Sequence, residues 1–298
     1  MVKFSKNLEI SLKVKKVFIE ITNICGLNCT FCPPNGRKNA VMSLDFFDKI
    51  NQQLQNVCHE IALHIVGDPM VLSNLNDYIE ISSKYNQKIN ITTSGFYMSP
   101  DKFSWFKNKN IKQVNFSINS YNSNPEKISF DLYSKNIFEF IKYKQDNNLD
   151  FFINLRLWNL DDNNSANQFN NIFIDKINNK FDTKIDLNSI DKKTSLRIQN
   201  KVLIAFDEYF EWPDLKSNHF SDGFCLGLNS HFGILCDGTV VPCCLDKNGV
   251  INLGNLHQVS LNEILTSSKT INIKQGFANN ICTEELCKKC TYRLKFNK

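Results

Sequence analysis

Residues 20–32 read EITNICGLNCTFC and place Cys25, Cys29 and Cys32 within eight positions. Thiolates at these spacings can bind one metal centre from two sides, and no fourth cysteine lies nearby in the sequence. An iron–sulfur cube normally takes four cysteine ligands, so a cube held by these three would leave one iron open to a different ligand. The alternatives are a zinc site or a set of core cysteines, although zinc favours paired Cys-x2-4-Cys units that supply four ligands.

The spacing Cys-x3-Cys-x2-Cys, with Phe31 just before the last cysteine, resembles the cluster loop of the radical S-adenosylmethionine (SAM) enzymes. In that family, SAM chelates the open iron of a [4Fe–4S] cluster through its amino and carboxylate groups. Reduction of the cluster then cleaves the sulfonium to methionine and a 5′-deoxyadenosyl radical, while the protein binds and orients the cofactors. The resemblance therefore implies a three-cysteine [4Fe–4S] cluster with SAM bound to it and Phe31 beside it.

Composition agrees with a folded metalloprotein. The chain has 298 residues, of which 42% are apolar, and α/β barrels commonly reach this length as one domain. Its net charge of +5 is mild and the basic residues are scattered, which does not favour nucleic acid as a partner. The amino terminus lacks the apolar core of a signal peptide, and no run is long enough to span a bilayer. Eleven cysteines without an export signal indicate reduced thiols and metal in a cytoplasmic protein.

Short apolar runs alternate with amphipathic segments along the chain. A β-branched run at 16–22 predicts a strand that ends at the cluster loop, and Ser43 is the expected N-cap of the helix that follows. This alternation predicts parallel strands joined by crossover helices, with ligand-binding loops at the carboxyl ends of the strands. Residues 159–200 give the weakest signals. Further strands are expected at about 60–66, 88–93, 112–119, 151–157 and 203–207, and helices at about 74–85, 100–107, 132–145 and 168–178.

Unusual residues follow the second strand. The run Gly67-Asp68-Pro69 stands where most radical SAM enzymes have Gly-Glu-Pro, whose carboxylate and neighbouring backbone receive the amino group of SAM. Asp68 keeps the negative charge but is one methylene shorter than Glu, so backbone carbonyls would contribute more of the binding. The alternative is an ordinary turn built from Gly, Asp and Pro.

The next three strand ends continue the resemblance. Thr93 and Ser94 resemble the family's Thr-Asn-Gly turn, which lines the SAM site. Ser117 would donate to the SAM carboxylate, and Asn119 would face the ribose or the substrate. The family often has Asp where this chain has Asn119, and an amide does not serve as an acid or base as a carboxylate does. Arg156 would meet the SAM carboxylate, because its planar fork pairs two donors with two oxygens. A surface salt bridge is the alternative for Arg156.

A second group of cysteines lies near the carboxyl terminus, within a predicted hairpin (strands 233–235 and 239–241) and a predicted helix at about 255–268. The pattern resembles the SPASM and twitch extensions of radical SAM enzymes, and it matches the shorter twitch form with one auxiliary cluster. The expected ligands of a second [4Fe–4S] cluster are Cys225, Cys243, Cys287 and Cys290, with Cys244 able to replace Cys243. A structural zinc site is chemically equally compatible with four cysteines.

The expected fold is α/β: a partial (β/α)6 TIM-like barrel at 14–210, preceded by a short extension at 1–13 and followed by a small cysteine-rich hairpin and helix unit at 211–298. The resemblance implies an oxidoreductase or transferase-type enzyme that cleaves SAM reductively and abstracts hydrogen from a small or medium-sized substrate. The auxiliary cluster would transfer electrons, and an electron donor such as flavodoxin or ferredoxin would be the partner.

Two other classes of function stay open. One is radical chemistry on a peptide or an RNA, and the other is a non-catalytic metal-binding adaptor. Peptide-modifying relatives often carry an amino-terminal leader-binding domain, for which about 15 residues before the first strand leave no room. RNA would require a basic surface. The sequence identifies neither the substrate nor the base, for which the candidates are Asn119, Asp161, Glu208 and Glu211.

Overall fold

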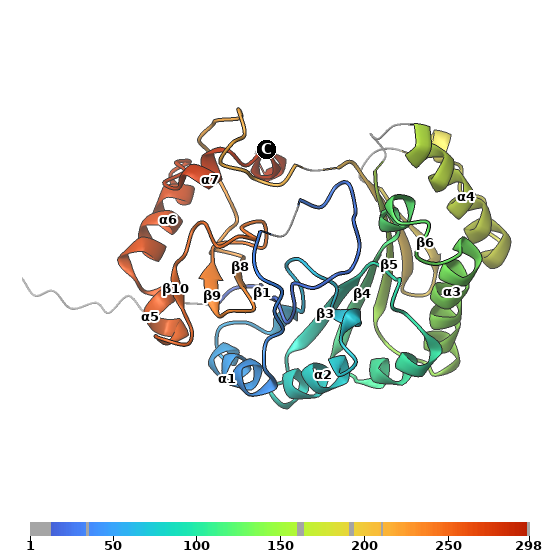
Figure 1. The fold of residues 1–298 in the computed structure, drawn as a ribbon, viewed down its shortest axis with the longest axis horizontal. Helices are drawn as coiled ribbons and strands as arrows, with labels where there is room; N and C mark the ends of the chain where they lie inside the picture. Colours follow the sequence, from blue (N-terminus) through green and yellow to red (C-terminus); the bar gives the residue numbers. More distant parts are fainter. Residues whose placement is uncertain (1–12, 34–35, 160–163, 191–193, 210, 297–298) are drawn as a thin grey trace, which may run out of the picture.

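The computed structural model describes residues 13–33, 36–159, 164–190, 194–209 and 211–296 (Figure 1). Its strands form one sheet in the order β10-β9-β8-β1-β2-β3-β4-β5-β7-β6. Within residues 14–210, six neighbouring strands run parallel, and the sheet does not close on itself, as expected for a partial (β/α)6 barrel. These six strands are β1 (Lys16–Ile19), β2 (Glu60–Ala62), β3 (Lys88–Thr93), β4 (Ile111–Ser117), β5 (Phe152–Trp158) and β7 (Val202–Asp207).

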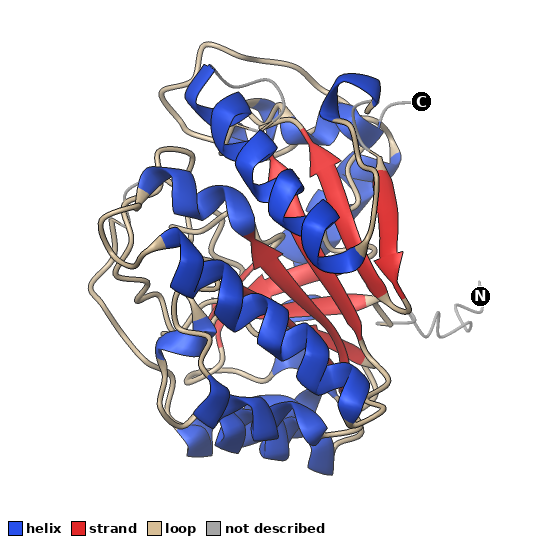
Figure 2. Cartoon of the chain, turned by 90° about the vertical axis from the view of Figure 1, so that its right-hand side faces the viewer, coloured by secondary structure: helices blue, strands red, loops and turns tan. Residues whose placement is uncertain are grey.

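Helices connect the parallel strands and cover the sheet, as the view from the α3 and α4 side shows (Figure 2). The predicted N-cap is confirmed, because the Ser43 hydroxyl accepts a hydrogen bond of 3.3 Å from the Phe46 N–H. The helix expected at 100–107 is a 3-10 helix, η2 (Pro100–Lys107). The other connecting segments are α1 (Leu44–Leu54), η1 (Pro69–Val71), α2 (Leu75–Lys84), η3 (Ile118–Ser123), α3 (Phe130–Asp146), α4 (Asn164–Phe181) and η4 (Leu187–Ser189).

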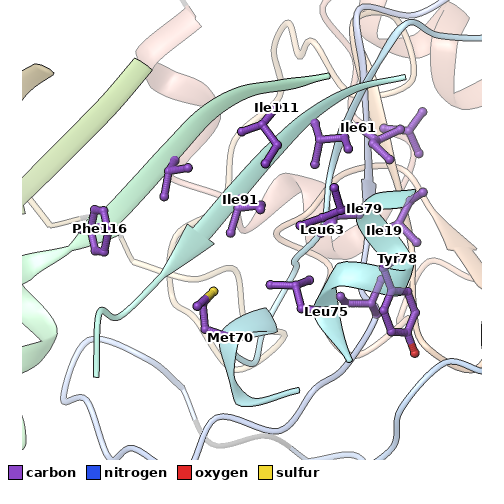
Figure 3. Close-up of a cluster of buried hydrophobic side chains, with 14 of the residues drawn as sticks. Ile19, Ile61, Leu63, Met70, Leu75, Tyr78, Ile79, Ile91, Ile111 and Phe116 are labelled. Carbon is purple, nitrogen blue, oxygen red and sulfur yellow. The ribbon is translucent and has the colours of Figure 1, made fainter. Parts of the chain in front are cut away.

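Side chains alternate across a sheet, so each strand packs one face against the helices and directs the other toward the barrel interior. On β3, Ile89 and Ile91 are fully buried under the helices, whereas Asn90 and Thr92 face the interior of the barrel. Figure 3 shows the helix-side core, in which apolar side chains of β1 to β4 pack against α2 and its neighbours. Each such side chain contributes roughly 1.5–3 kcal/mol to folding by burial. The polar alternate positions are thereby held at the inner wall.

The carboxyl-terminal region continues the same sheet. The predicted hairpin is confirmed as β8 (His231–Ile234) and β9 (Thr239–Val241), and β8 pairs in parallel with β1. The expected unit at 211–298 is therefore joined to the barrel by a strand ladder, beside β1 in Figure 1. The helical segments that follow are α5 (Leu261–Leu265), α6 (Ser268–Ala278), α7 (Glu285–Lys288) and η5 (Tyr292–Phe296).

One expected helix was wrong, and one strand was not expected. The single helix at about 255–268 is divided into a short strand, β10 (Gly254–Asn255), and the start of two helices, because Ser260 caps α5 and Ser267 caps α6. The sequence also gave no sign of β6 (Ser195–Gln199), which pairs antiparallel with β7 at the sheet edge. In the described part of the chain, no helix is long and apolar enough to cross a membrane.

Candidate functional site

A cavity of about 420 Å³ lies inside the barrel and reaches the carboxyl ends of the parallel strands. Ligand pockets commonly have this size. Pro69 and Cys287 do not line the cavity; Pro69 is buried in η1. The other expected site residues all line it: Cys25, Cys29, Phe31, Cys32, Gly67, Asp68, Thr93, Ser94, Ser117, Asn119, Arg156, Cys225, Cys243 and Cys290.

The loop that carries the first three cysteines is held by distant groups. Asn124 at the end of η3 donates to the Cys29 Sγ at 3.4 Å and accepts from the Asn28 N–H at 2.8 Å. Tyr97 donates its hydroxyl proton to the Cys25 carbonyl. Gly67 lies directly against the start of the loop, where a Cβ would come within 2.5 Å of the Thr22 carbonyl oxygen. With φ at +79°, that position accepts only glycine without strain.

The thiols of this loop are protonated at neutral pH when no metal is bound. Burial and the nearby Asp68 carboxylate raise the pKa of Cys25 to about 12, and burial raises the pKa of Cys29 to about 11. Burial also raises the pKa of Cys32. A thiolate is the form that binds metal, so cluster binding here must release protons. Three free thiols on one short loop at one cavity are a suitable donor set for a cluster with an open iron.

Asp68 organises the strand ends beside this loop. Its Oδ2 accepts from the Thr93 hydroxyl at 2.9 Å, the Ser94 N–H at 2.8 Å and the Ser94 hydroxyl at 2.6 Å. Its Oδ1 accepts from the Met70 N–H at 3.0 Å. Burial raises the pKa of Asp68, and these four hydrogen bonds oppose the shift. Most of the acceptor capacity of the carboxylate is thus used to hold the turn at 93–94.

The second set of cysteines meets the cavity from the carboxyl-terminal side. Burial raises the pKa of Cys243 well above its ordinary value, with Cys244, Cys287 and Cys225 as electrostatic neighbours. Cys287 and Cys225 also neighbour Cys290. The expected ligands are therefore brought together, and Cys282 and Cys244 lie beside them. Cys236 does not belong to this set, since its thiol and N–H both lie 3.1 Å from the Glu20 Oε2.

The cysteine sets do not form a ready-made site for a single ion. Among the described residues, no group of three or more His, Cys, Asp and Glu side chains is arranged to hold one metal ion. Structural zinc requires four ligands around one centre, whereas each thiolate of a [4Fe–4S] cube binds a different iron.

A buried ion pair joins the cluster loop to the carboxyl-terminal hairpin, and the sequence analysis missed it. Glu20 is fully buried and lies 2.6 Å from the Arg37 Nη2. It also accepts the Cys236 N–H at the β8–β9 turn. An acidic residue inside an apolar strand run was the available signal, but the sequence did not indicate its partners.

The two histidines on the inner wall are neutral. Burial lowers the pKa of His64 to about 3 and that of His231 to about 4, so neither carries charge at pH 7. Phe18 makes edge contacts with both rings, at centroid distances of 5.9 and 5.8 Å. Of the four candidate bases, Asn119 lines the cavity, whereas Glu208 and Glu211 do not. Asp161 lies outside the described residues.

Two family models match the chain. The Radical SAM superfamily model matches residues 19–162, and the iron–sulfur cluster-binding domain model named SPASM matches residues 225–291. The GTP 3′,8-cyclase of Mannheimia succiniciproducens is 26% identical over 109 residues, which are 34% of this chain and 32% of that enzyme. The match thus spans only about a third of that relative's length.

Solved structures share the fold. BtrN in complex with AdoMet and 2-DOIA superposes with a TM-score of 0.60 at 13% identity, over 93% of each chain. The enzyme anSMEcpe with bound AdoMet gives a TM-score of 0.58 at 15% identity, over 94% of this chain and 84% of that one. SuiB of Streptococcus suis, bound to its precursor peptide SuiA, gives 0.52 at 12% identity, over 96% and 73%.

Proposed function

Since the chain belongs to the radical SAM superfamily and carries a carboxyl-terminal SPASM domain, we propose that it abstracts hydrogen from a small or medium-sized substrate. As a member, it uses a [4Fe–4S] cluster, SAM and additional iron–sulfur chemistry. When bound, the first cluster and SAM supply a 5′-deoxyadenosyl radical. The observation that carries the proposal is the single cavity lined by both cysteine sets. A substrate in this cavity would lie between the radical source and an electron acceptor.

The cluster-binding roles follow from the loops. Cys25, Cys29 and Cys32 would hold the first cluster, and Phe31, which lines the same cavity, would help to bind SAM. Asn124 donates to the Cys29 sulfur and restrains that ligand. Cys225, Cys243, Cys287 and Cys290, which neighbour one another, would hold an auxiliary [4Fe–4S] cluster, with Cys244 as the alternative to Cys243.

The SAM-binding roles follow from the strand ends. Asp68 fixes the turn that contains Thr93 and Ser94. Backbone groups of 67–69 would therefore receive the SAM amino group. Ser117, at the end of β4, would donate to the SAM carboxylate, and Asn119, in η3, would face the ribose or the substrate. The dense wall of buried side chains behind these strands keeps the site rigid, which preserves the positions of the reacting groups.

We assign the enzyme to the oxidoreductases. Four cysteine ligands leave no open iron, so the auxiliary cluster would take an electron from the substrate radical rather than bind the substrate. A reduced flavodoxin or ferredoxin in the cytoplasm would supply the electron that reduces the first cluster. SuiB binds a peptide in its structure, so a peptide substrate is the second candidate. Comparing a peptide library with small metabolites as triggers of turnover separates the two.

Reductive cleavage of SAM tests the proposal. The anaerobically reconstituted protein, reduced with dithionite, should form 5′-deoxyadenosine from SAM and contain about eight iron atoms per chain. A protein that binds iron and SAM but forms no deoxyadenosine would be a metal-binding adaptor. A measured content of about four iron atoms and one zinc per chain would refute the auxiliary cluster.

A further inference from the structure

Below the strand ends, the cavity reaches a group of amide and hydroxyl side chains on β3 and β4. These side chains, which we call the amide floor, are Asn90, Thr92, Gln113 and Asn115. In its upper level Thr92 lies beside Asn115, and in its lower level Asn90 lies beside Gln113. Branched apolar side chains usually fill such positions in a barrel, whereas ligand pockets combine an apolar wall with a few polar groups. The amide floor is therefore a candidate for ligand binding.

Strand register separates the amide floor from the level at which SAM is expected. Ser117 pairs with Arg156, so both residues belong to the SAM level at the strand ends. The first cluster loop joins the strand ends as well, since the Asp68 N–H donates to the Ile24 carbonyl at 2.9 Å. The upper level of the floor lies two residues nearer the amino ends of the strands than Ser117, and the lower level lies four residues nearer. At about 3.3 Å per residue, these levels are roughly 7 and 13 Å below Ser117.

Backbone carbonyls fix the orientation of the amides in the floor. The Asn90 Nδ2 lies 3.2 Å from the Ile61 carbonyl oxygen. The Asn115 Nδ2 lies 3.4 Å from the Ile91 carbonyl oxygen. A carbonyl oxygen only accepts hydrogen bonds, so the NH2 groups must face these two atoms. The Asn115 Oδ1 then accepts from the Gln113 Nε2 at 2.6 Å, and each amide NH2 group of the floor has a partner.

This orientation leaves amide oxygens free. From the residues that the structure describes, no hydrogen bond reaches the Asn90 Oδ1 or the Gln113 Oε1. Asn154, the register partner of Asn115 on β5, donates to the Asn115 Oδ1 at 3.5 Å, and its own Oδ1 is buried without a partner. The Thr92 hydroxyl accepts from the Asn115 Nδ2 at 3.2 Å and keeps its own proton to donate. Buried polar atoms without partners are costly, so a ligand that completes these bonds is stabilised by them.

At the level of the floor, no described side chain carries an unpaired charge. Burial lowers the pKa values of His64 and His231, so both rings are neutral at pH 7. Lys16 lies 2.6 Å from Glu60. Asp68 is the one carboxylate among the described lining residues, and it is engaged at the strand ends. An ammonium group would find no free carboxylate at the floor, and an anion would meet the free amide oxygens.

We propose that the amide floor binds the hydroxyl groups of an uncharged, polyhydroxylated substrate, a sugar or a polyol. A hydroxyl group both donates and accepts, so it can donate to the amide oxygens of Asn90 and Gln113 and accept from Thr92. This inference deepens the proposed function and rests on it, since it takes the occupant of the cavity below SAM to be the substrate.

Equilibrium dialysis of the SAM-saturated, anaerobically reconstituted protein tests the floor. The probes are radiolabelled D-glucose, ribitol and myo-inositol. The controls are cyclohexanol, which has one hydroxyl group on an apolar ring, and N-acetylglycinamide, which has the amides of a peptide. We expect at least one of the three polyhydroxylated probes, and neither control, to fill one site per chain.

A substitution at the floor should weaken this binding. Gln113→Met should lower the affinity for the bound probe by about threefold to tenfold, because it replaces an amide by an apolar side chain of similar length. Gln258→Met makes the same chemical change at an exposed residue that does not line the cavity, and it should bind as the wild type does. If Gln113→Met fails to fold, Thr92→Val, which replaces the hydroxyl by a methyl group, is measured in its place.

SAM affinity is measured on the same samples. Weaker probe binding with unchanged SAM affinity in the floor variant supports a substrate site separate from SAM. An equal loss of SAM affinity would assign the floor to SAM and overturn the proposal. Wild-type protein that binds none of the three probes, or that binds a control as tightly, would overturn it as well, and binding of N-acetylglycinamide alone would point to a peptide substrate.

The two proposals fail differently. Wild-type protein that binds a polyhydroxylated probe at the floor but forms no 5′-deoxyadenosine from SAM retains the floor and refutes the radical chemistry. Wild-type protein that forms 5′-deoxyadenosine but binds none of the three probes retains the radical chemistry and refutes the floor.

Discussion

Replacing Asp68 by Asn tests whether this carboxylate organises the site. The side chain is 1% exposed and accepts four hydrogen bonds, three at Oδ2 and one at Oδ1. An amide keeps one carbonyl oxygen, which would face the three donors from Thr93 and Ser94. Its NH2 group would then face the Met70 N–H, so that donor would lose its acceptor.

The magnitude follows from those contacts. Hydrogen bonds to a charged group contribute about 1.5–3 kcal/mol and neutral ones about 0.5–1.5, so three bonds lose roughly 1 kcal/mol each. An unsatisfied Met70 N–H costs roughly 1–3 kcal/mol more. Relief from burying a charge offsets part of this loss. We expect Asp68→Asn to lower the free energy of unfolding by about 2–4 kcal/mol and to weaken SAM binding.

Urea unfolding followed by circular dichroism, with SAM affinity from equilibrium dialysis, measures both effects. Asp77→Asn is the matched control, because Asp77 is exposed in the first turn of the adjacent α2 and should change stability by about 0.5 kcal/mol or less. Wild-type stability and SAM affinity in Asp68→Asn would refute the organising role.

Three further predictions concern other parts of the fold. Glu20→Gln breaks the buried pair with Arg37 and should lower the free energy of unfolding, measured in urea, by about 3 kcal/mol. Glu139→Gln, in an exposed pair with Lys135, should lower it by less than about 0.5 kcal/mol. Equal effects of the two substitutions would contradict the bridging role of Glu20. His231 stays neutral when folded until about pH 4, whereas the unfolded chain binds the proton from about pH 6.5 downward. The free energy of unfolding should therefore fall as the pH drops from about 6.5 to 4. His231→Gln should flatten this dependence on pH. An unchanged slope in that variant would show that His231 does not cause it. Cys29→Ala should abolish 5′-deoxyadenosine formation while Cys287→Ala spares part of it, and equal loss in folded variants would contradict the separate roles of the two clusters.

Local patterns predicted the barrel well. The strand at 88–93 was expected with the bounds that β3 has, because apolar and polar residues alternate there and turns flank it. The edge strand β6 carries Ser195 and Arg197 on its exposed face and lacks the apolar run that marks a buried strand. Edge strands often have such polar faces, so periodicity alone does not reveal them.

The site was predictable where its residues follow one another in the chain. The cysteines of the loop and the Gly67–Asp68 turn are visible as short motifs. The partners that hold them are not, since Asn124 lies 95 positions from Cys29 and Cys236 lies 216 positions from Glu20. Contacts at such separations arise from the topology of the sheet, which brings β8 beside β1. The free oxygens of the amide floor likewise depend on what surrounds them in the folded cavity.

Electron paramagnetic resonance of the reduced Cys287→Ala/Cys290→Ala protein, with and without SAM, tests the central claim most directly. This variant should keep the cluster at Cys25, Cys29 and Cys32 and lose the auxiliary one. The account predicts a [4Fe–4S] signal that changes when SAM is added, because SAM occupies the iron that no cysteine holds. A signal that SAM leaves unchanged, or the absence of any cluster in anaerobically prepared protein, would contradict it.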